Sequence, residues 1–151
     1  MFFRKKSQSV VSGKELVIQI QWGGYYTSKE EDKFGLFRLL DFNKDAYQIQ
    51  IFREKFDHLP SLEEVKELQP FIWHAPLAVG SLLDDEALTL IGPKVLDDEA
   101  LSGYGEYLKQ MDVTESAIQE LFQRLIQYSH EAPTTVKLSE SSDRTVSVST
   151  Q

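Results

Sequence analysis

The chain has 151 residues, 41% of them hydrophobic and 11% aromatic, which is typical of one folded globular domain. Its formal net charge is −8, and it has no cysteine, which excludes a disulfide framework, a thiolate metal site and a cysteine nucleophile. No apolar run approaches the ~20 residues of a membrane-spanning helix, and no apolar segment follows the first basic residues as in a signal peptide, so we expect a cytoplasmic protein without a membrane partner.

The start of the chain predicts a leader followed by a bent strand. We expect residues 1–13 to form a flexible leader, and residues 14–130 to form a single α+β domain. From Lys14 to Trp22 apolar residues alternate mainly with polar ones, which is the pattern of a half-buried strand. Gly23 and Gly24 interrupt this pattern, so we expect the strand to resume at 25–27 after a bend, with a charged loop at 28–33.

A β-hairpin is predicted next. Its arms are Phe34–Phe42 and Ala46–Arg53, and Asn43-Lys44-Asp45 supplies the residue types of a short turn. In the second arm Tyr47, Ile49 and Ile51 alternate with Gln48 and Gln50. Three sequential strands with short links favour an antiparallel meander.

The middle of the chain predicts a helix and then an interrupted strand. Ser61 and Glu64 have the spacing of a capping box, and Pro70 ends the predicted helix. The apolar stretch 71–83 is predicted as a strand. Because Pro76 has no backbone N–H, this strand is expected at a sheet edge or broken there.

The same hexapeptide, Leu-Asp-Asp-Glu-Ala-Leu, occurs at Leu83–Leu88 and at Leu96–Leu101. A short strand at Thr89–Ile91 and the Gly92-Pro93 turn separate the two copies. We expect a turn in the first copy, and in the second a helix start with Asp97 as its N-cap. The repeat therefore predicts two different local structures and no internal duplication of the fold.

The clearest helix is the last one. Asp112–Glu115 is predicted as a capping box, and an apolar stripe from Ile118 to Ile126 gives this helix one buried face. The segment Glu131–Gln151 is rich in Ser and Thr and is predicted as a disordered tail. The fold class is thus α+β, with an antiparallel sheet of about four to five strands packed on one face by the C-terminal helices.

The side chains of Glu63, Glu64 and Glu67, and that of His74, are candidates for metal binding and for acid–base catalysis, respectively. No cofactor is expected, because no cofactor-binding motif is present. Glu63, Glu64 and Glu67 have a helical spacing that can hold Mg²⁺, which is the basis of an alternative function as a metal-dependent hydrolase. The capping role of Glu64 and the presence of Lys66 weigh against it. His74 has the chemistry of a general base, although a hydrogen-bonded core histidine fits its apolar surroundings better.

The excess of negative charge is confined to one part of the chain. Residues 84–131 contain 11 acidic and 3 basic residues, whereas the remainder contains 13 of each. Such a region repels nucleic acid and attracts a basic protein. The predicted partner-binding residues are the acidic side chains of both hexapeptides and the aromatic side chains beside the glycine pair: Asp84, Asp85, Glu86, Asp97, Asp98, Glu99, Trp22, Tyr25 and Tyr26.

The function predicted from these patterns is a non-catalytic acidic protein-binding module, such as an inhibitor, an immunity-type protein or an adaptor. The localised charge supports it, together with aromatic residues of the kind enriched at protein interfaces. Besides the hydrolase, a third class stays open, which is a small-ligand carrier with an aromatic pocket near Trp22 and Trp73.

Overall fold

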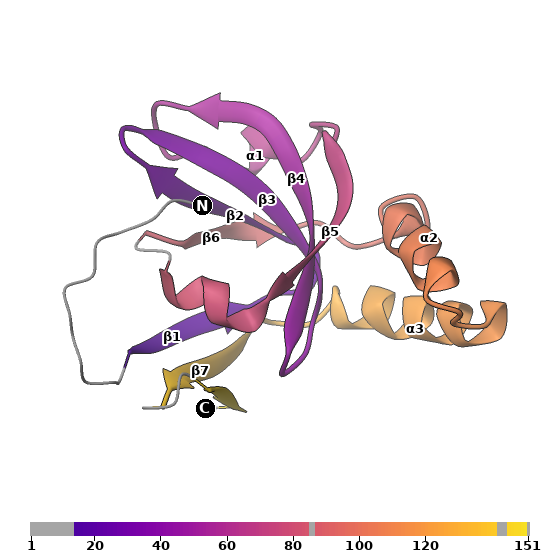
Figure 1. Cartoon of the computed structure of the whole chain (residues 1–151). Helices are drawn as coiled ribbons and strands as arrows, with labels where there is room; N and C mark the ends of the chain where they lie inside the picture. Colours follow the sequence, from indigo (N-terminus) through magenta and orange to yellow (C-terminus); the bar gives the residue numbers. More distant parts are fainter. Residues whose placement is uncertain (1–13, 85–86, 142–144, 151) are drawn as a thin grey trace.

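The structure is a computed structural model that describes residues 14–84, 87–141 and 145–150. Within these ranges the chain is an α+β protein with eight strands in two antiparallel sheets (Figure 1). The five-stranded sheet has the order β5-β4-β3-β2-β6. Its strands are β2 (Gly24–Glu30), β3 (Lys33–Phe42), β4 (Ala46–Phe56), β5 (Ile72–Ala78) and β6 (Thr89–Pro93). The predicted leader lies outside the described residues.

The predicted meander exists, because both arms of the predicted hairpin are its strands β3 and β4, and the segment 25–27, where the bent strand was expected to resume, lies in β2. β2, β3, β4 and β5 pair consecutively, and β5, which contains Pro76, is an edge strand as predicted. The part of the first predicted strand that precedes the glycine pair is not in this sheet. The charged loop expected at 28–33 is also wrong, because β2 continues to Glu30 and β3 begins at Lys33. Glu31, with φ of 58°, makes the tight turn between them.

The second sheet corrects the prediction of a disordered tail. It has the order β1-β7-β8, formed by β1 (Glu15–Ile20), β7 (Thr134–Glu140) and β8 (Val146–Thr150). In the register of β1 and β7, Leu16 faces Leu138 and Ile18 faces Val136. Val136 and Leu138 are buried, so the few apolar residues of this segment are spaced to line one face of a strand. The sheet also crosses the predicted domain boundary at residue 130.

One face of the five-stranded sheet packs against this second sheet. Tyr26, Leu39 and Ile49 are buried in a core that they share with Val136 and Leu138 of β7. The 3₁₀ helix η1 (Val79–Asp84) lies between the two sheets (Figure 1). It buries the side chains of its residues 79 and 82 in the same core.

The opposite face carries the helices, as predicted, and they cover its two ends separately. At one end α1 (Leu62–Val65) packs Val65 against Tyr25 and Phe52. At the other end α2 (Ser102–Gln110) and α3 (Glu115–Tyr128) lie together (Figure 1). Their core consists of Leu40, Leu96, Ala100, Leu101, Tyr104 and Leu125. Among the described residues, no helix is long and apolar enough to cross a membrane.

Two of the predicted helices do begin with a side-chain N-cap, but the length of one and the capping residue of the other differ from the prediction. The capping box of Ser61 and Glu64 is present, although α1 is only 4 residues long. α3 is capped by Thr114, whose side chain accepts a hydrogen bond from the Ala117 N–H. The expected box from Asp112 is therefore wrong. Asp112 instead has φ of 65° in the turn between α2 and α3.

The two hexapeptides do adopt different structures. In the first, Leu83 and Asp84 end η1, whereas residues 85 and 86 lie outside the described residues, and with them the expected turn. In the second, the Asp97 carboxylate accepts a 2.8 Å hydrogen bond from the Ala100 N–H. Asp97 thus caps the turn that leads into α2, which itself begins later, at Ser102.

Candidate functional site

Three side chains form a row across the helical face of the five-stranded sheet. Tyr25 on β2 lies opposite Arg38 on β3, and Arg38 lies opposite Gln50 on β4. All three residues are at most 5% exposed. They form the floor of a pocket of about 80 Å³ between the α1 end and the α2 end, with walls from residues 66–70, Trp73 and residues 94–100. We call this the Arg38 pocket.

Arg38, on the floor of the pocket, forms hydrogen bonds with the wall segment that contains Lys94. Its Nε donates to the Gly23 carbonyl at 3.1 Å, and its Nη2 donates to the Lys94 carbonyl at 2.6 Å. Its guanidinium carbon lies 5.1 Å from the centre of the Tyr25 ring. Burial lowers the pKa of Arg38, while the charges of Tyr25 and Asp97 oppose this shift. No carboxylate within the described ranges lies within ion-pair distance of this guanidinium.

Gly23 permits this arrangement, because its φ of 79° belongs to the left-handed region and a Cβ there would collide with the Lys94 carbonyl oxygen. The Gly23 N–H donates to the Leu39 carbonyl, and the Lys94 N–H donates to the Gly23 carbonyl. The predicted bend at the glycine pair is therefore the joint between β2, β3 and the pocket wall.

The glutamines of β4 are buried, although alternation alone indicates a solvated face. Gln50 donates from Nε2 to the Ala100 carbonyl at 3.0 Å. Gln48 accepts at Oε1 from His74 Nε2, 2.6 Å away. Arg38 and Gln50 had not been predicted as site residues. The signal in the sequence is their uncommon position, since polar residues occupy the middle of two predicted central strands.

The aromatic residues expected at an exposed rim are mostly buried. Tyr25 belongs to the pocket floor, and Tyr26 belongs to the core between the sheets, where it stacks on Phe37. The Tyr26 hydroxyl donates to the Gln19 carbonyl at 2.6 Å. Trp22 is partly buried and packs edge-on against Tyr128, 5.3 Å between ring centres. The prediction of an aromatic binding rim is therefore corrected for Tyr25 and Tyr26, because the bent strand is covered on both faces.

The two acidic clusters are not brought together. Asp97 and Glu99 line the Arg38 pocket, and Asp98 is exposed beside them. Asp84 lies at the end of η1 instead, where it forms a 3.1 Å ion pair with Lys14. Asp85 and Glu86 are outside the described residues. Any acidic surface formed by residues 97–99 is thus separate from Asp84.

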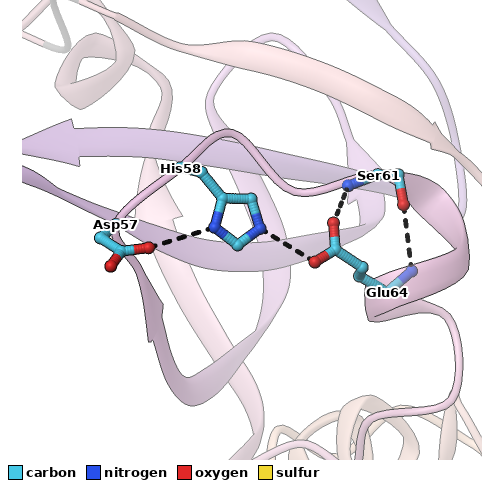
Figure 2. A network of polar contacts seen from close by, with 4 residues as sticks. All are labelled: Asp57, His58, Ser61 and Glu64. Carbon is cyan, nitrogen blue, oxygen red and sulfur yellow. Dashed lines mark hydrogen bonds and ion pairs between the residues drawn. The ribbon is translucent and has the colours of Figure 1, made fainter.

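Of the three glutamates considered for metal binding, Glu64 belongs to a network of polar contacts (Figure 2). The His58 ring lies between Asp57, at 3.2 Å, and Glu64, at 2.9 Å. Glu64 also accepts from the Ser61 N–H at 2.9 Å, and the Ser61 hydroxyl accepts from the Glu64 N–H rather than contacting His58. This is a capping box extended by a histidine, without the serine–histidine bond that a nucleophilic serine needs. Glu64 raises the pKa of His58 most, followed by Asp57.

Glu63 pairs with Lys66 at 2.9 Å, whereas Glu67 lines the Arg38 pocket. The three glutamates therefore face different neighbours. Within the part of the chain that the structure describes, no group of three or more His, Asp or Glu side chains is arranged to hold a metal ion.

A second polar network lies under α2. The Tyr104 hydroxyl donates to Asp41 at 2.8 Å, and Trp22 Nε1 lies 3.4 Å from the same carboxylate. Burial raises the pKa of Asp41, while these hydrogen bonds lower it. His74 stacks between α2 and the sheet, 5.1 Å from Tyr104 and 4.5 Å from Tyr107, and burial lowers its pKa. These contacts make His74 a packed neutral histidine that joins α2 to β4.

No protein-family model, curated protein or solved structure matches this chain.

Proposed function

We propose that this protein is a non-catalytic binding module that engages a basic protein partner through the surface of its helices. Residues 94–131 contain 8 acidic and 3 basic residues, and every one of these acidic residues is exposed. We call them the acidic helical surface: Asp97, Asp98, Glu99, Glu106, Asp112, Glu115, Glu120 and Glu131. This concentration of exposed carboxylates is the observation that carries the proposal.

Few of these charges are neutralised locally. Within the described ranges, Glu106 and Glu115 pair only with Lys109, at 3.6 and 3.7 Å, and the other six acidic residues have no ion pair. Exposed pairs of this kind contribute little to stability. An unpaired concentration of like charge attracts an oppositely charged protein and speeds the encounter. Solubility alone does not require that the acidic excess be confined to one region.

The same segment exposes apolar side chains. Val95 is 44% exposed, Met111 is 60% exposed and Tyr128 is 37% exposed. Protein interfaces combine an apolar centre with a polar rim, and methionine and tyrosine are enriched in them. These residues give a partner apolar contacts in addition to charge. An inhibitor, an immunity-type protein or an adaptor can each act in this way, and we place this action in the cytoplasm, away from nucleic acid.

The test compares two variants of equal charge change. One combines Asp98→Asn, Glu106→Gln and Glu120→Gln on the helical surface. The control combines Glu31→Gln, Asp32→Asn and Asp45→Asn at exposed turns of the five-stranded sheet. Quantitative affinity capture from lysate at low salt is expected to show basic proteins held by the wild type and the control, lost by the helical variant, and released as salt rises. Equal capture of those proteins by all three chains would contradict the proposal.

A further inference from the structure

The Arg38 guanidinium has one edge that the fold leaves uncommitted. Its Nε and Nη2 donate to the carbonyls of Gly23, Lys94 and Val95. Nη1, which carries two more N–H donors, donates to none of the described residues. Arg38 is 5% exposed and lines the pocket. Nη1 is not fully buried, so a carboxylate that entered the pocket could reach it and form a strong charge-assisted hydrogen bond.

The other charged side chains of the pocket differ in whether they already have a hydrogen-bond or ion-pair partner. Lys66 is paired with Glu63, and Lys94 donates from Nζ to the Lys66 carbonyl at 2.7 Å. Asp97 already accepts the Ala100 N–H. Glu67 and Glu99 have neither a hydrogen bond nor an ion pair from their carboxylates within the described ranges. Within the described ranges the pocket therefore offers positive charge from the Arg38 guanidinium edge and the Lys94 ammonium group, and negative charge from the carboxylates of Glu67, Asp97 and Glu99, none of which has an ion pair.

This combination disfavours a ligand of a single charge. A phosphate at Nη1 would lie in the field of Glu67 and Glu99, and a simple cation near those carboxylates would lie in the field of Arg38. A molecule that carries both charges satisfies both sides. The aromatic rings of Phe52 and Trp73, which also line the pocket, suit the apolar part or the cationic nitrogen of such a molecule.

The size of the pocket limits the ligand. A cavity needs on the order of 10–15 Å³ of this kind of volume for each water molecule, so about 80 Å³ accommodates roughly five to eight non-hydrogen atoms. We propose that the Arg38 pocket binds a small zwitterion of the amino-acid type, with its carboxylate on Nη1 of Arg38 and its ammonium group toward Glu67 and Glu99. The zwitterion is a small free amino acid, because the carboxyl end of a peptide that ends in lysine has ten non-hydrogen atoms in its last residue and exceeds this size.

The first experiment separates the two charges. The ¹⁵N-labelled protein is titrated with glycine, alanine, acetate, methylammonium and inorganic phosphate, and separately with a short peptide that ends in lysine. Saturable shifts of the Trp73 indole signal are expected with glycine or alanine, whereas the peptide is expected to give none because its last residue is too large for the pocket. Acetate, methylammonium and phosphate are each expected to bind at least about tenfold more weakly. Equal binding of acetate or phosphate, or no saturable shift with any zwitterion, overturns the proposal.

The second experiment uses variants that leave the buried row intact. Glu67→Gln combined with Glu99→Gln changes exposed side chains and is expected to weaken zwitterion binding at least about tenfold while strengthening acetate binding. Glu31→Gln combined with Asp32→Asn, in the exposed turn between β2 and β3 outside the pocket, is the matched control and is expected to bind as the wild type does. Unchanged zwitterion binding in the double variant contradicts the assigned role of the two carboxylates. Because the helical variant of the partner test leaves Glu67 and Glu99 unchanged, either proposal can fail without the other.

Discussion

Leu96 and Ser129 are joined by a buried hydrogen bond that fixes the second hexapeptide to the end of α3. The Leu96 N–H donates to the Ser129 hydroxyl at 2.9 Å, and this hydroxyl donates to the Ile126 carbonyl at 2.6 Å. Leu96 is 1% exposed and Ser129 is 3% exposed, so water does not reach the Leu96 N–H and cannot substitute for the Ser129 hydroxyl. The contact spans 33 residues of sequence.

Ser129→Ala is therefore expected to destabilise the protein by about 1–3 kcal/mol, because it leaves a buried N–H unsatisfied. Urea unfolding of the wild type and the variant measures this difference. Ser116→Ala, at an exposed position in the first turn of α3, is the control and is expected to change stability by less than about 0.5 kcal/mol. Equal stabilities of Ser129→Ala and the wild type would show that the bond is not maintained in solution.

Leu138 tests whether the C-terminal segment belongs to the core. Its side chain is fully buried in the core that the two sheets share. Leu138→Ala is therefore expected to lower the free energy of unfolding by about 2–5 kcal/mol. The control is Val17→Ala on β1, a residue that is 58% exposed, with an expected cost below about 0.5 kcal/mol. Thermal unfolding followed by circular dichroism compares the two. A disordered tail would make Leu138→Ala indistinguishable from the control.

Gly103 is required by the close approach of α2 to β5. A Cβ at this position would stand 2.9 Å from the Trp73 Cβ and 3.1 Å from its backbone carbonyl atoms. Gly103→Ala is expected to destabilise by about 1–3 kcal/mol through overpacking, even though alanine favours a helix more than glycine does. In the control Gly35→Ala, the nearest atom is the flexible Nζ of Lys55 at 3.3 Å, and a smaller loss is expected. A Gly103→Ala variant more stable than the wild type would refute the close packing.

His58 gives the protein a pH dependence of known sign. The hydrogen bonds that the protonated His58 ring donates to Glu64 and then to Asp57 raise its pKa. Its contribution to stability is therefore fully present below the unfolded histidine pKa of about 6.5 and is lost as pH rises through the folded pKa. The pKa values of both carboxylates are lowered, which keeps them ionised in this range. The stability advantage of the wild type over His58→Gln is expected at about pH 5.5 and to disappear by about pH 9.

NMR titration of the His58 ring protons measures the raised pKa directly, and urea unfolding at the two pH values measures the stability difference. His130→Gln removes another exposed histidine and serves as the control, because no carboxylate contacts the ring of His130 in the described part of the chain. A difference between wild type and His58→Gln that stayed constant with pH would contradict the role of the two carboxylates.

Local chemistry accounts for the elements that were predicted correctly. Alternation of apolar residues gives β1 and β4, and an apolar run before the turn residues 43–45 gives β3. The Ser61–Glu64 spacing gives a capped helix, and Pro76 marks an edge strand. These features depend on neighbours within a few residues. The α+β class with helices on one sheet face follows from them.

The errors arise where a partner far along the chain supplies the missing contacts. Val136 and Leu138 are too few to indicate a strand by themselves, but β1 presents an apolar face of matching register 118 to 122 residues earlier. Gln48 and Gln50 suggest exposure, but His74 and the Ala100 carbonyl satisfy their hydrogen bonds and permit burial. Tyr25 and Tyr26 are residue types that are common at protein interfaces, but their rings are buried in two cores on opposite faces of the sheet.

The sequence by itself determined the class of the fold, most of the helix-forming and strand-forming segments before residue 131, the bend at Gly23 and the confinement of the acidic excess to one region. Periodicity, capping and charge are properties of local residue order. Only the tertiary structure decided which strands share a sheet and which polar residues are buried. It alone brought Tyr25, Arg38 and Gln50 into one row and placed Glu67 and Glu99 beside them. The physical reason is that burial and pairing depend on which surfaces meet, and these surfaces come from segments tens of residues apart.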